Sequence, residues 1–428
     1  MKFTYYNPVK ICFGVDYLEA IKDLASKLKD ARFLLVTSKG FSKRGLSDKV
    51  ANVLGKQLVG IVDEILPNPQ IRHLQWIKAN LCEFDAIVAL GGGSVIDSAK
   101  FLISNSSLTQ DTRIANDSKD SSLRGARSEA SATKQSKSHE SKRQSESITQ
   151  IQINTNSLQV SNSPKSQSLP NGLPRFGVAE SRNDSILDSQ NDITQEPNIP
   201  IYAIPTTSGT SSELTHWATI WDNENFIKHS LSDESLYPKI AFYDPHLTLS
   251  LPRETTIHTA LDALSHSFES IWNKSANPIS THYALVAIEI ILRDLGDLAQ
   301  NLDLLPLRTS IMQASMYAGL AFSNTQTALA HALSYPLTMR FSTSHGLACS
   351  FSLPLLLECL PPSKARDLLL PFQARLLGLF EKLEISTNPK DYGLDSAFVE
   401  EIFATLNPRA KNGIFDIEGV KNALLKYM

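Results

Sequence analysis

An apolar stretch that runs straight into three glycines limits the folds open to this chain more than any other feature. Residues 85–90 form a short and mostly apolar run, typical of a buried parallel strand, and Gly91, Gly92 and Gly93 follow without a break. Glycines let a backbone turn tightly and approach another group closely. A helix beginning near Ser94 would direct its free amide groups and positive dipole end at this turn, which suits a pyrophosphate. The usual Gly-x-Gly-x-x-Gly pattern is absent, so a glycine turn without a ligand stays open as the alternative.

Strands and helices alternate around this turn. We expect strands at 11–14, 32–37, 58–65 and 85–90, separated by helices at 17–28, 46–54 and 71–81. A further strand near 200–205 leads into a hydroxyl-rich turn that is suited to phosphate or ribose, or is a plain helix cap. Strands at 215–221 and 240–243 are expected to complete the sheet. This alternation predicts a doubly wound, Rossmann-like α/β domain that binds ligands at the carboxyl ends of its strands.

The composition changes sharply between about 105 and 198. This segment is dense in Ser, Gln, Asn, Lys and Asp, so it cannot bury enough apolar surface to offset the entropy cost of ordering. We therefore expect a disordered insertion within a surface loop. The chain then divides into an α/β domain at 1–248, interrupted by the insertion, and an all-helical domain at 249–428. Helical spacing in the second domain is clearest at 283–295, 309–322, 371–383, 398–406 and 420–427.

Four residues of the helical domain have the chemistry of a metal site. Asp262 and His266 are four apart, so they share one face of the expected helix, and His331 and His345 lie in a second segment. One carboxylate and three imidazoles suit a borderline divalent ion such as Fe(II) or Zn(II), with a position left open for substrate. Taken singly, each of these residues could equally be a surface pair or a packed core histidine. A site built from all four would lie in the cleft between the two domains.

The net charge and the lengths of the apolar runs exclude several classes of partner. A formal net charge of −3 gives no general attraction to nucleic acid or to an anionic membrane. No apolar run approaches the length of a membrane span, and the first residues lack the apolar segment of a secretory signal. The cysteines have no paired spacing and are expected to be reduced; they are Cys12, Cys82, Cys349 and Cys359. A cytoplasmic location is therefore expected.

Several short sequence motifs resemble those of the iron-containing alcohol dehydrogenase family and occur in the same order along the chain. They are GGGSVIDSAK at 91–100, PTTSGTSSE at 205–213, DALSH at 262–266, ANP at 276–278, and the segment from His331 to Gly346. These words span the chain apart from the insertion. The resemblance implies a dehydroquinate synthase-like architecture, in which an α/β Rossmann-like dinucleotide-binding domain precedes an all-helical metal-binding domain. It also implies a homodimer.

The same resemblance implies which residues form the site. The family's metal ligands, one aspartate and three histidines, fall on Asp262, His266, His331 and His345 and would hold Fe(II) or Zn(II). A nicotinamide cofactor, NADH or NADPH, would lie along the two turns and their neighbours, namely Asn68, Gly91, Gly92, Gly93, Ser94, Asp97, Thr206, Thr207, Thr210 and Lys228.

One departure from the family pattern concerns the coenzyme. Where the family usually has an aspartate after its second strand, this chain has Ser38, with Lys39, Lys43 and Arg44 nearby. Loss of the acid removes repulsion against a 2′-phosphate, and the basic residues would favour it. We therefore assign Ser38 to the cofactor site and expect NADPH to be preferred, with NADH left open.

A second departure concerns the substrate end. Tyr335 stands where many members have a histidine thought to help proton movement, which makes Tyr335 a candidate catalytic residue. The words around 262–273 and 331–338 look like the phosphonoacetaldehyde reductase branch, which reduces phosphonoacetaldehyde to 2-hydroxyethylphosphonate. Arg340 and Lys274 are candidate partners for a phosphonate by sequence proximity, although both could be solvated surface charges.

The expected function is metal-assisted hydride transfer between a nicotinamide and a small aldehyde or alcohol. The open alternatives are a general short-chain alcohol, polyol or glycerol-phosphate dehydrogenase, and a lyase of the dehydroquinate synthase type. A non-enzymatic alternative is a scaffold that uses the insertion to bind partner proteins.

Overall fold

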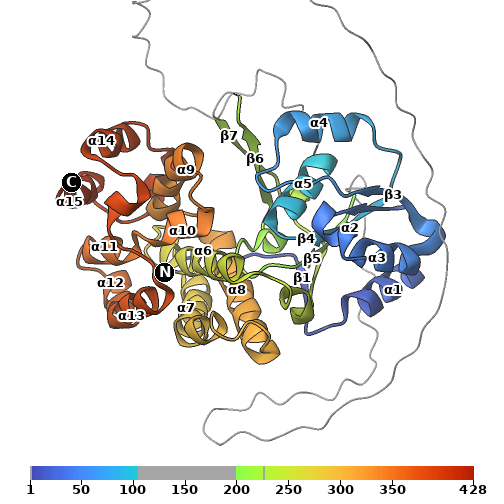
Figure 1. Ribbon diagram of the computed structural model, residues 1–428, viewed down its shortest axis with the longest axis horizontal. Coiled ribbons are helices and arrows are strands. Elements are labelled where there is room, and N and C mark those ends of the chain that lie inside the picture. Colours follow the sequence, from blue (N-terminus) through green and yellow to red (C-terminus); the bar gives the residue numbers. More distant parts are fainter. Residues whose placement is uncertain (1, 105–198, 225–226) are drawn as a thin grey trace, which may run out of the picture. The chain divides into compact units, whose positions relative to one another are not determined.

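The computed structural model describes residues 2–104, 199–224 and 227–428, so the insertion predicted at about 105–198 lies outside the described residues. Along the described chain, an α/β part ends at Tyr243 and a helical part begins at Arg253 (Figure 1). This arrangement is the predicted fold class. Both parts belong to one compact unit, so the predicted division into domains at 248 stays a prediction.

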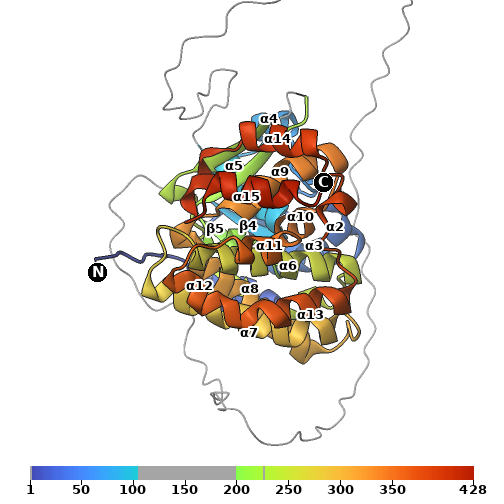
Figure 2. The same ribbon diagram turned by 90° about the vertical axis from the view of Figure 1, so that its left-hand side faces the viewer.

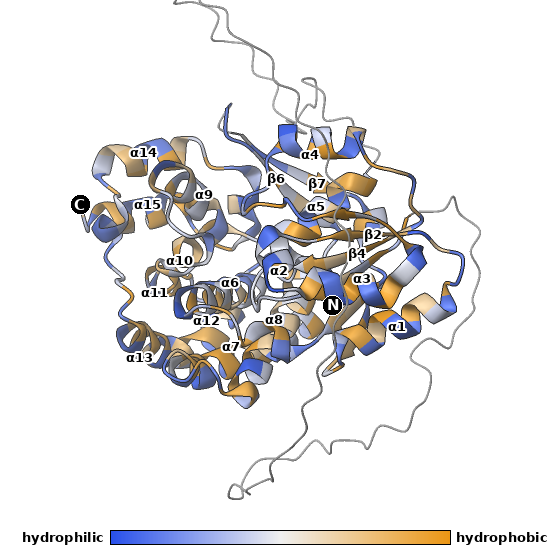
Figure 3. Ribbon diagram, turned by 45° about the vertical axis from the view of Figure 1, so that its right-hand side comes forward, coloured by the Kyte–Doolittle hydropathy of each residue, from blue (hydrophilic) through white to orange (hydrophobic). Residues whose placement is uncertain are grey.

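Within the described residues, a sheet of six parallel strands forms the centre of the α/β part. The strands are β1 (Lys10–Phe13), β2 (Phe33–Val36), β3 (Leu58–Val62), β4 (Ala86–Gly91), β5 (Ile201–Pro205) and β8 (Ile240–Tyr243), in the spatial order β1-β8-β5-β4-β2-β3. β2, β4, β5 and β8 are buried along their full length, which explains their continuous apolar sequences (Figure 3).

The helices of the α/β part connect these strands. They are α1 (Tyr17–Lys27), α2 (Lys39–Lys43), α3 (Leu46–Leu54), α4 (Ile71–Ala79) and α5 (Gly93–Ile103). α1 packs against α3, and α4 packs against α5. Asp16 caps α1, because its carboxylate accepts from the amides of Leu18 and Glu19. The short helix α2 was not predicted; the others lie where their sequence spacing placed them.

The strand order reverses between β2 and β4. The chain moves outward from β2 to β3 and returns on the other side of β2 as β4. Val36 pairs with Ala89 and Gly91 pairs with Pro205, so the carboxyl ends of β2, β4 and β5 lie at one edge of the sheet. In open α/β sheets, the crevice at such a reversal is where ligands bind. The glycine turn that follows β4 opens at this place.

One expectation about the sheet is wrong. We expected 215–221 to complete the main sheet, but β6 (Trp217–Asp222) pairs with β7 (Ile227–Ser232) in a separate antiparallel ribbon. Alternating burial along β6 suits such a ribbon, and β7 was not predicted at all. The ribbon places Trp221 directly opposite Lys228.

Ten helices build the second part around an apolar core. They are α6 (Arg253–Ile271), α7 (Pro278–Leu298), α8 (Leu305–Thr325), α9 (Leu329–Phe341), α10 (His345–Ser350), α11 (Leu353–Glu358), α12 (Lys364–Leu369), α13 (Gln373–Leu383), α14 (Ser396–Ala404) and α15 (Ile417–Leu425) (Figure 2). All five predicted helical stretches overlap helices of this set.

α6, α7 and α8 pack against one another at the centre of this part. α7 begins at a capping box in which the Asn277 side chain accepts from the Ser280 amide, and the Ser280 hydroxyl accepts from the Asn277 amide. Trp272, fully buried, lies in the core beyond the end of α6. Among the described helices, none is both long and apolar enough to cross a membrane.

Candidate active site

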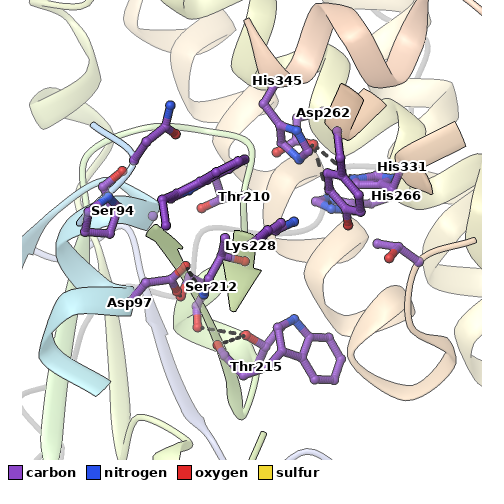
Figure 4. A pocket seen from close by; sticks show the side chains of 18 of the residues that line it. Ser94, Asp97, Thr210, Ser212, Thr215, Lys228, Asp262, His266, His331 and His345 are labelled. Atoms are coloured by element: carbon purple, nitrogen blue, oxygen red, sulfur yellow. Dashed lines mark hydrogen bonds and ion pairs between the residues drawn. The ribbon is translucent and has the colours of Figure 1, made fainter. Parts of the chain in front are cut away.

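Three helices bring the four predicted metal residues together. Asp262 and His266 project from α6, His331 from α9, and His345 is the first residue of α10. The Nε2 atoms of His266, His331 and His345 lie 3.8, 3.4 and 3.8 Å from Asp262 Oδ1 (Figure 4). The juxtaposition expected from the sequence is therefore present, and the role of these residues as ligands is our prediction.

The spacing of these atoms fits a divalent ion. Ligand atoms about 2.1 Å from a tetrahedral ion lie about 3.4 Å from one another, close to the three distances of 3.4–3.8 Å between Asp262 Oδ1 and the imidazole nitrogens. Asp262 Oδ1 and His331 Nε2 are buried and have no hydrogen-bond partner within the described chain. An unpaired buried carboxylate oxygen is costly unless a cation or a donor meets it. The donor set and its unsatisfied atoms both suit iron(II) or zinc(II).

The imidazoles are held by ring packing. The His266 ring is sandwiched, because Phe322 of α8 stacks on it at a centroid separation of 3.9 Å and the His331 ring lies 4.5 Å from it. Tyr335 lies parallel to His345 with the ring centroids 6.0 Å apart. These contacts fix the ring planes in advance, which lowers the entropy cost of assembling the site.

The protonation of Asp262, His266 and His345 also favours metal binding. Burial lowers the pKa of His266 to about 4 and that of His345 to about 3, so both imidazoles are neutral at pH 7. Burial alone would raise the pKa of Asp262, but the neighbouring imidazoles, His266 first, bring it below its ordinary value. A carboxylate and neutral imidazoles are the forms that coordinate a metal. Burial alone would lower the pKa of His331, but Cys349, Glu269 and Asp262 raise it well above its ordinary value, so a metal ion has to displace a proton from this ring.

Glu269 stands behind the cluster and was missed by the sequence reasoning. It is fully buried, and its Oε2 lies 2.6 Å from His331 Nδ1. Its two oxygens also accept from the amides of Ala328 and His331, at 2.9 and 3.1 Å. A carboxylate on the far nitrogen of a histidine fixes the ring and raises its basicity as a ligand. Glu269 follows Asp262 by seven residues and His266 by three on α6, so the helical spacing itself carried the signal.

We expect Glu269→Gln to lower metal affinity by about 10- to 100-fold, the usual effect of removing such a partner. The amide would present a donor where His331 Nδ1 and the backbone amides need acceptors. Equilibrium competition with a chelator measures the change. Glu254→Gln, an exposed position in the first turn of the same helix, is the matched control. Unchanged affinity in Glu269→Gln would show that His331 does not depend on this carboxylate.

Cys349 of α10 is a further donor beside the cluster. Its Sγ lies 3.7 Å from both ring nitrogens of His345, and it can be grouped with Asp262, His331 and His345 within 4.8 Å. Asp262, His331, His345 and Cys349 therefore form a second possible donor set, in which Cys349 takes the place of His266. Burial raises the pKa of the Cys349 thiol.

The predicted cofactor residues separate into two groups. Asn68, Gly93, Ser94, Asp97, Thr210 and Lys228 line one pocket together with the four metal residues. The other five predicted residues are not part of that lining. They are Gly91, Gly92, Thr206 and Thr207, at the ends of β4 and β5 and in the turns that follow them, and Ser38, just after the carboxyl end of β2. α5 has no side-chain cap, so its amino-terminal end is open to a phosphate.

The glycines serve packing more directly than we expected. None of the three has a positive φ. A Cβ on Gly93 would lie 2.6 Å from Thr210 Oγ1, and one on Gly92 would lie 3.0 Å from Thr207 Oγ1. The glycines therefore let the two turns touch each other, and this contact shapes the crevice above them.

Asp97 and Lys100 brace the second turn from below. Asp97 accepts from the Ser212 hydroxyl and, at 2.9 Å, from the Thr219 amide. Lys100 is fully buried, and its ammonium donates to Ser212, Thr215 and Trp217. Asp97 thus lines the pocket while both of its oxygens are already engaged, so it supports the turn as well as facing the expected cofactor.

The two cations predicted from sequence proximity to meet a phosphonate lie elsewhere. Arg340 is exposed and pairs with Glu401 at 3.1 Å, and the Lys274 ammonium donates to the Lys411 carbonyl at 2.7 Å. Neither lines the pocket. Lys228 and Arg409 do line it, and sequence reasoning had placed Lys228 at the cofactor and had missed Arg409.

Comparison with known proteins places this geometry in a family. A model of iron-containing alcohol dehydrogenases matches residues 8–128 and 176–245, and a model of the C-terminal region of the Fe-containing alcohol dehydrogenase family matches residues 256–368. These matches cover more than half of the chain. The chain belongs to the iron-containing alcohol dehydrogenase family.

Individual relatives agree over shorter stretches. The NAD-dependent methanol dehydrogenase of Bacillus methanolicus is 32% identical over 180 residues, which are 42% of this chain and 47% of that protein. The phosphonoacetaldehyde reductase of Streptomyces viridochromogenes is 33% identical over 162 residues, which are 38% of this chain and 41% of that protein. The chain thus matches less than half the length of each of these two relatives.

A solved structure matches over the whole length. The sulfoacetaldehyde reductase from Bifidobacterium kashiwanohense in complex with NAD+ has a TM-score of 0.73 and 21% identity, covering 100% of this chain and 99% of that chain. At this identity the likeness shows the fold. Family membership confirms the enzyme class expected from the sequence, with iron and NAD as the cofactors of that class. The NADPH preference, the phosphonate substrate, the dimer and the cytoplasmic location stay predictions.

Proposed function

We propose that this protein reduces a small aldehyde to its alcohol, using a divalent metal ion and a reduced nicotinamide. One observation carries the proposal. Asp262 Oδ1 has three imidazole nitrogens within 3.8 Å, and the pocket lined by these four residues continues to Ser94 at the open amino-terminal end of α5. Family membership makes the same chemistry the expected one.

The residues that line the pocket would contribute to the reaction according to where they lie. A metal ion at these ligands would supply Lewis acidity and the nicotinamide would supply the hydride. Phe322 and Trp221 give the pocket apolar walls that limit water beside the reacting atoms. Tyr335 lies in the same lining against His345 and is our candidate for the group that gives the alcohol its proton.

We further propose that the aldehyde carries an acidic head, with phosphonoacetaldehyde as the best single substrate and 2-hydroxyethylphosphonate as its product. Two observations support this choice. One relative is a phosphonoacetaldehyde reductase, and one structure of the same fold is a sulfoacetaldehyde reductase. Both names denote two-carbon aldehydes with an acidic group next to the methylene.

An aldehyde panel tests the proposed function. The full-length chain, loaded with iron or zinc, is assayed by oxidation of NADH and NADPH with phosphonoacetaldehyde, sulfoacetaldehyde, propanal and glyceraldehyde, and in the reverse direction with glycerol. We expect metal-dependent turnover, highest with the acidic aldehydes. Turnover only in the direction of glycerol oxidation would favour the polyol dehydrogenase alternative. Inactivity of the metal-loaded protein with every substrate would contradict the proposal and favour the scaffold.

The coenzyme prediction has a separate test at Ser38. Ser38 lies two residues after β2 and is the N-cap of α2, where its side chain makes no capping bond, and the basic side chains of Lys39, Lys43 and Arg44 follow it. A carboxylate here would repel a 2′-phosphate and accept from a 2′-hydroxyl. We expect Ser38→Asp to lower the ratio of kcat/KM for NADPH over NADH by about tenfold or more. Two like charges about 4 Å apart repel by about 1–4 kcal/mol between bulk water and a protein surface, and a tenfold change needs about 1.4 kcal/mol. Ser38→Ala, which adds no charge, should leave the ratio unchanged; a wild-type preference for NADH would refute the prediction.

A further inference from the structure

Two cationic side chains that line the pocket have no carboxylate partner within the described residues. Lys228 lies in β7, and Arg409 lies in a short 3-10 helix at Pro408–Asn412. Both line the pocket that contains the four metal residues. Within the described residues, the polar contact of Arg409 is a hydrogen bond from Nη2 to Ser230 Oγ at 2.9 Å, and neither cation forms an ion pair with Asp or Glu.

Tyr335 and the helix that carries it are the surroundings of these two cations. The Lys228 ammonium sits 3.5 Å from the centroid of the Tyr335 ring, and that ring lies parallel to His345. The segment that carries Arg409 packs on α9, the helix of His331 and Tyr335. Figure 4 shows Lys228 between Asp97 and the metal residues.

The expected cofactor does not account for Arg409. The amino-terminal end of α5, beside Ser94, is where a pyrophosphate finds free amides, and a 2′-phosphate would lie near Ser38 at the end of β2. Arg409 is instead bonded to Ser230, which lies two residues after Lys228 on the same face of β7, and Lys228 contacts the Tyr335 ring beside His345. A guanidinium has five N–H donors, and the bond to Ser230 uses one. The remaining donors are available for a planar or tetrahedral oxyanion, which arginine binds with two parallel bonds.

We propose that Arg409, assisted by Lys228, binds an oxyanionic head group on the substrate and so selects acidic two-carbon aldehydes over neutral ones. This inference rests on the proposed function and adds to it the residue that binds the head group of the substrate. Ser230 orients the guanidinium, and the ring of Tyr335 holds the lysine ammonium at the same end of the pocket. Arg409 lies beyond the residues matched by the C-terminal family model, so the family model says nothing about this position.

The first test compares a charged aldehyde with a neutral one of the same shape. Tert-butylacetaldehyde replaces the phosphonate of phosphonoacetaldehyde by a neutral group of similar size. In Arg409→Gln, we expect kcat/KM for phosphonoacetaldehyde and sulfoacetaldehyde to fall by about 10- to 100-fold, the range for a charge-assisted hydrogen bond, while the neutral aldehyde changes by less than about threefold. Arg340→Gln is the matched control, since Arg340 is an exposed arginine paired with Glu401 outside the pocket. Equal losses for charged and neutral aldehydes, or no loss for either, would overturn the proposal.

A binding measurement separates this inference from the proposed function. Methylphosphonate carries the head group without an aldehyde, so its binding to the metal- and NAD-loaded chain can be followed by calorimetry even if no aldehyde is turned over. We expect binding to the wild type and to Arg340→Gln, and at least about tenfold weaker binding to Arg409→Gln. Binding that is the same in all three proteins would overturn the role of Arg409. Selective loss in Arg409→Gln together with complete inactivity toward aldehydes would uphold the anion site and contradict the reductase.

Discussion

Replacement of Asp262 by asparagine is expected to remove the bound metal and to lower turnover by about 10³-fold or more. Asp262 Oδ1 is the atom on which three imidazoles converge, and it is the negatively charged member of the set. An amide of the same shape offers a neutral oxygen, so the cation loses its charge partner. Lewis acid assistance is worth several kcal/mol, and each 1.36 kcal/mol is about tenfold in rate. Metal content by mass spectrometry and kcat for aldehyde reduction are the two measurements.

Ser267→Ala is the matched control for this experiment. Ser267 is a fully buried residue of the same helix next to His266, and its hydroxyl donates to the Ala263 carbonyl at 2.8 Å. This hydrogen bond does not involve any of the four proposed metal ligands, so the metal content and kcat of Ser267→Ala should remain close to those of the wild type. A fully active Asp262→Asn protein, or one that keeps its metal, would mean that the ion is held elsewhere.

A single methyl group on Gly346 is expected to damage both the fold and the site. Gly346 lies where α10 crosses α6, and a Cβ there would lie 1.8 Å from the His258 carbonyl oxygen and 3.2 Å from Asp262 Cβ. The obstructing atom is backbone, so α10 itself must move, and His345 begins that helix. Overpacking of this kind costs about 1–3 kcal/mol of unfolding free energy, and a displacement of about 1 Å at a catalytic group costs about 10²-fold in rate.

Gly378→Ala shows what the same change does where there is room. Gly378 lies inside α13, and a Cβ there meets nothing within 4 Å. Alanine in a helix interior stabilises by roughly 0.5–1 kcal/mol relative to glycine, so this variant should unfold at a higher temperature with unchanged kcat. Thermal unfolding and kcat/KM are measured on both variants. A Gly346→Ala protein as stable and active as the wild type would show that α10 does not pack on α6 as described.

The sequence was most informative where one element carries the whole signal. Asp262 and His266 could be paired from their separation of four residues on a single helix, and the strand preceding Gly91 could be recognised from its apolar run. Glu269 belongs to the same helical face and was predictable in the same way. In each of these cases the periodicity of one helix or strand determines which side chains lie together.

Features that depend on contacts between distant elements were not predictable in this way. Alternation in β6 indicates a strand but not its partner, so the ribbon with β7 was mistaken for part of the main sheet. Proximity in sequence placed Arg340 near the substrate, whereas the last turn of α9 directs it to Glu401. Arg409 reaches the pocket only because its 3-10 segment packs on α9. No local pattern around Arg409 could have shown this.

Anomalous diffraction from crystals of the iron-loaded protein with NAD bound tests the proposed metal site most directly. We expect one strong iron peak about 2.0–2.2 Å from Asp262 Oδ1 and from the Nε2 atoms of His266, His331 and His345, facing the nicotinamide ring. An iron peak at another position, with no iron between these four side chains, would contradict the proposed metal site.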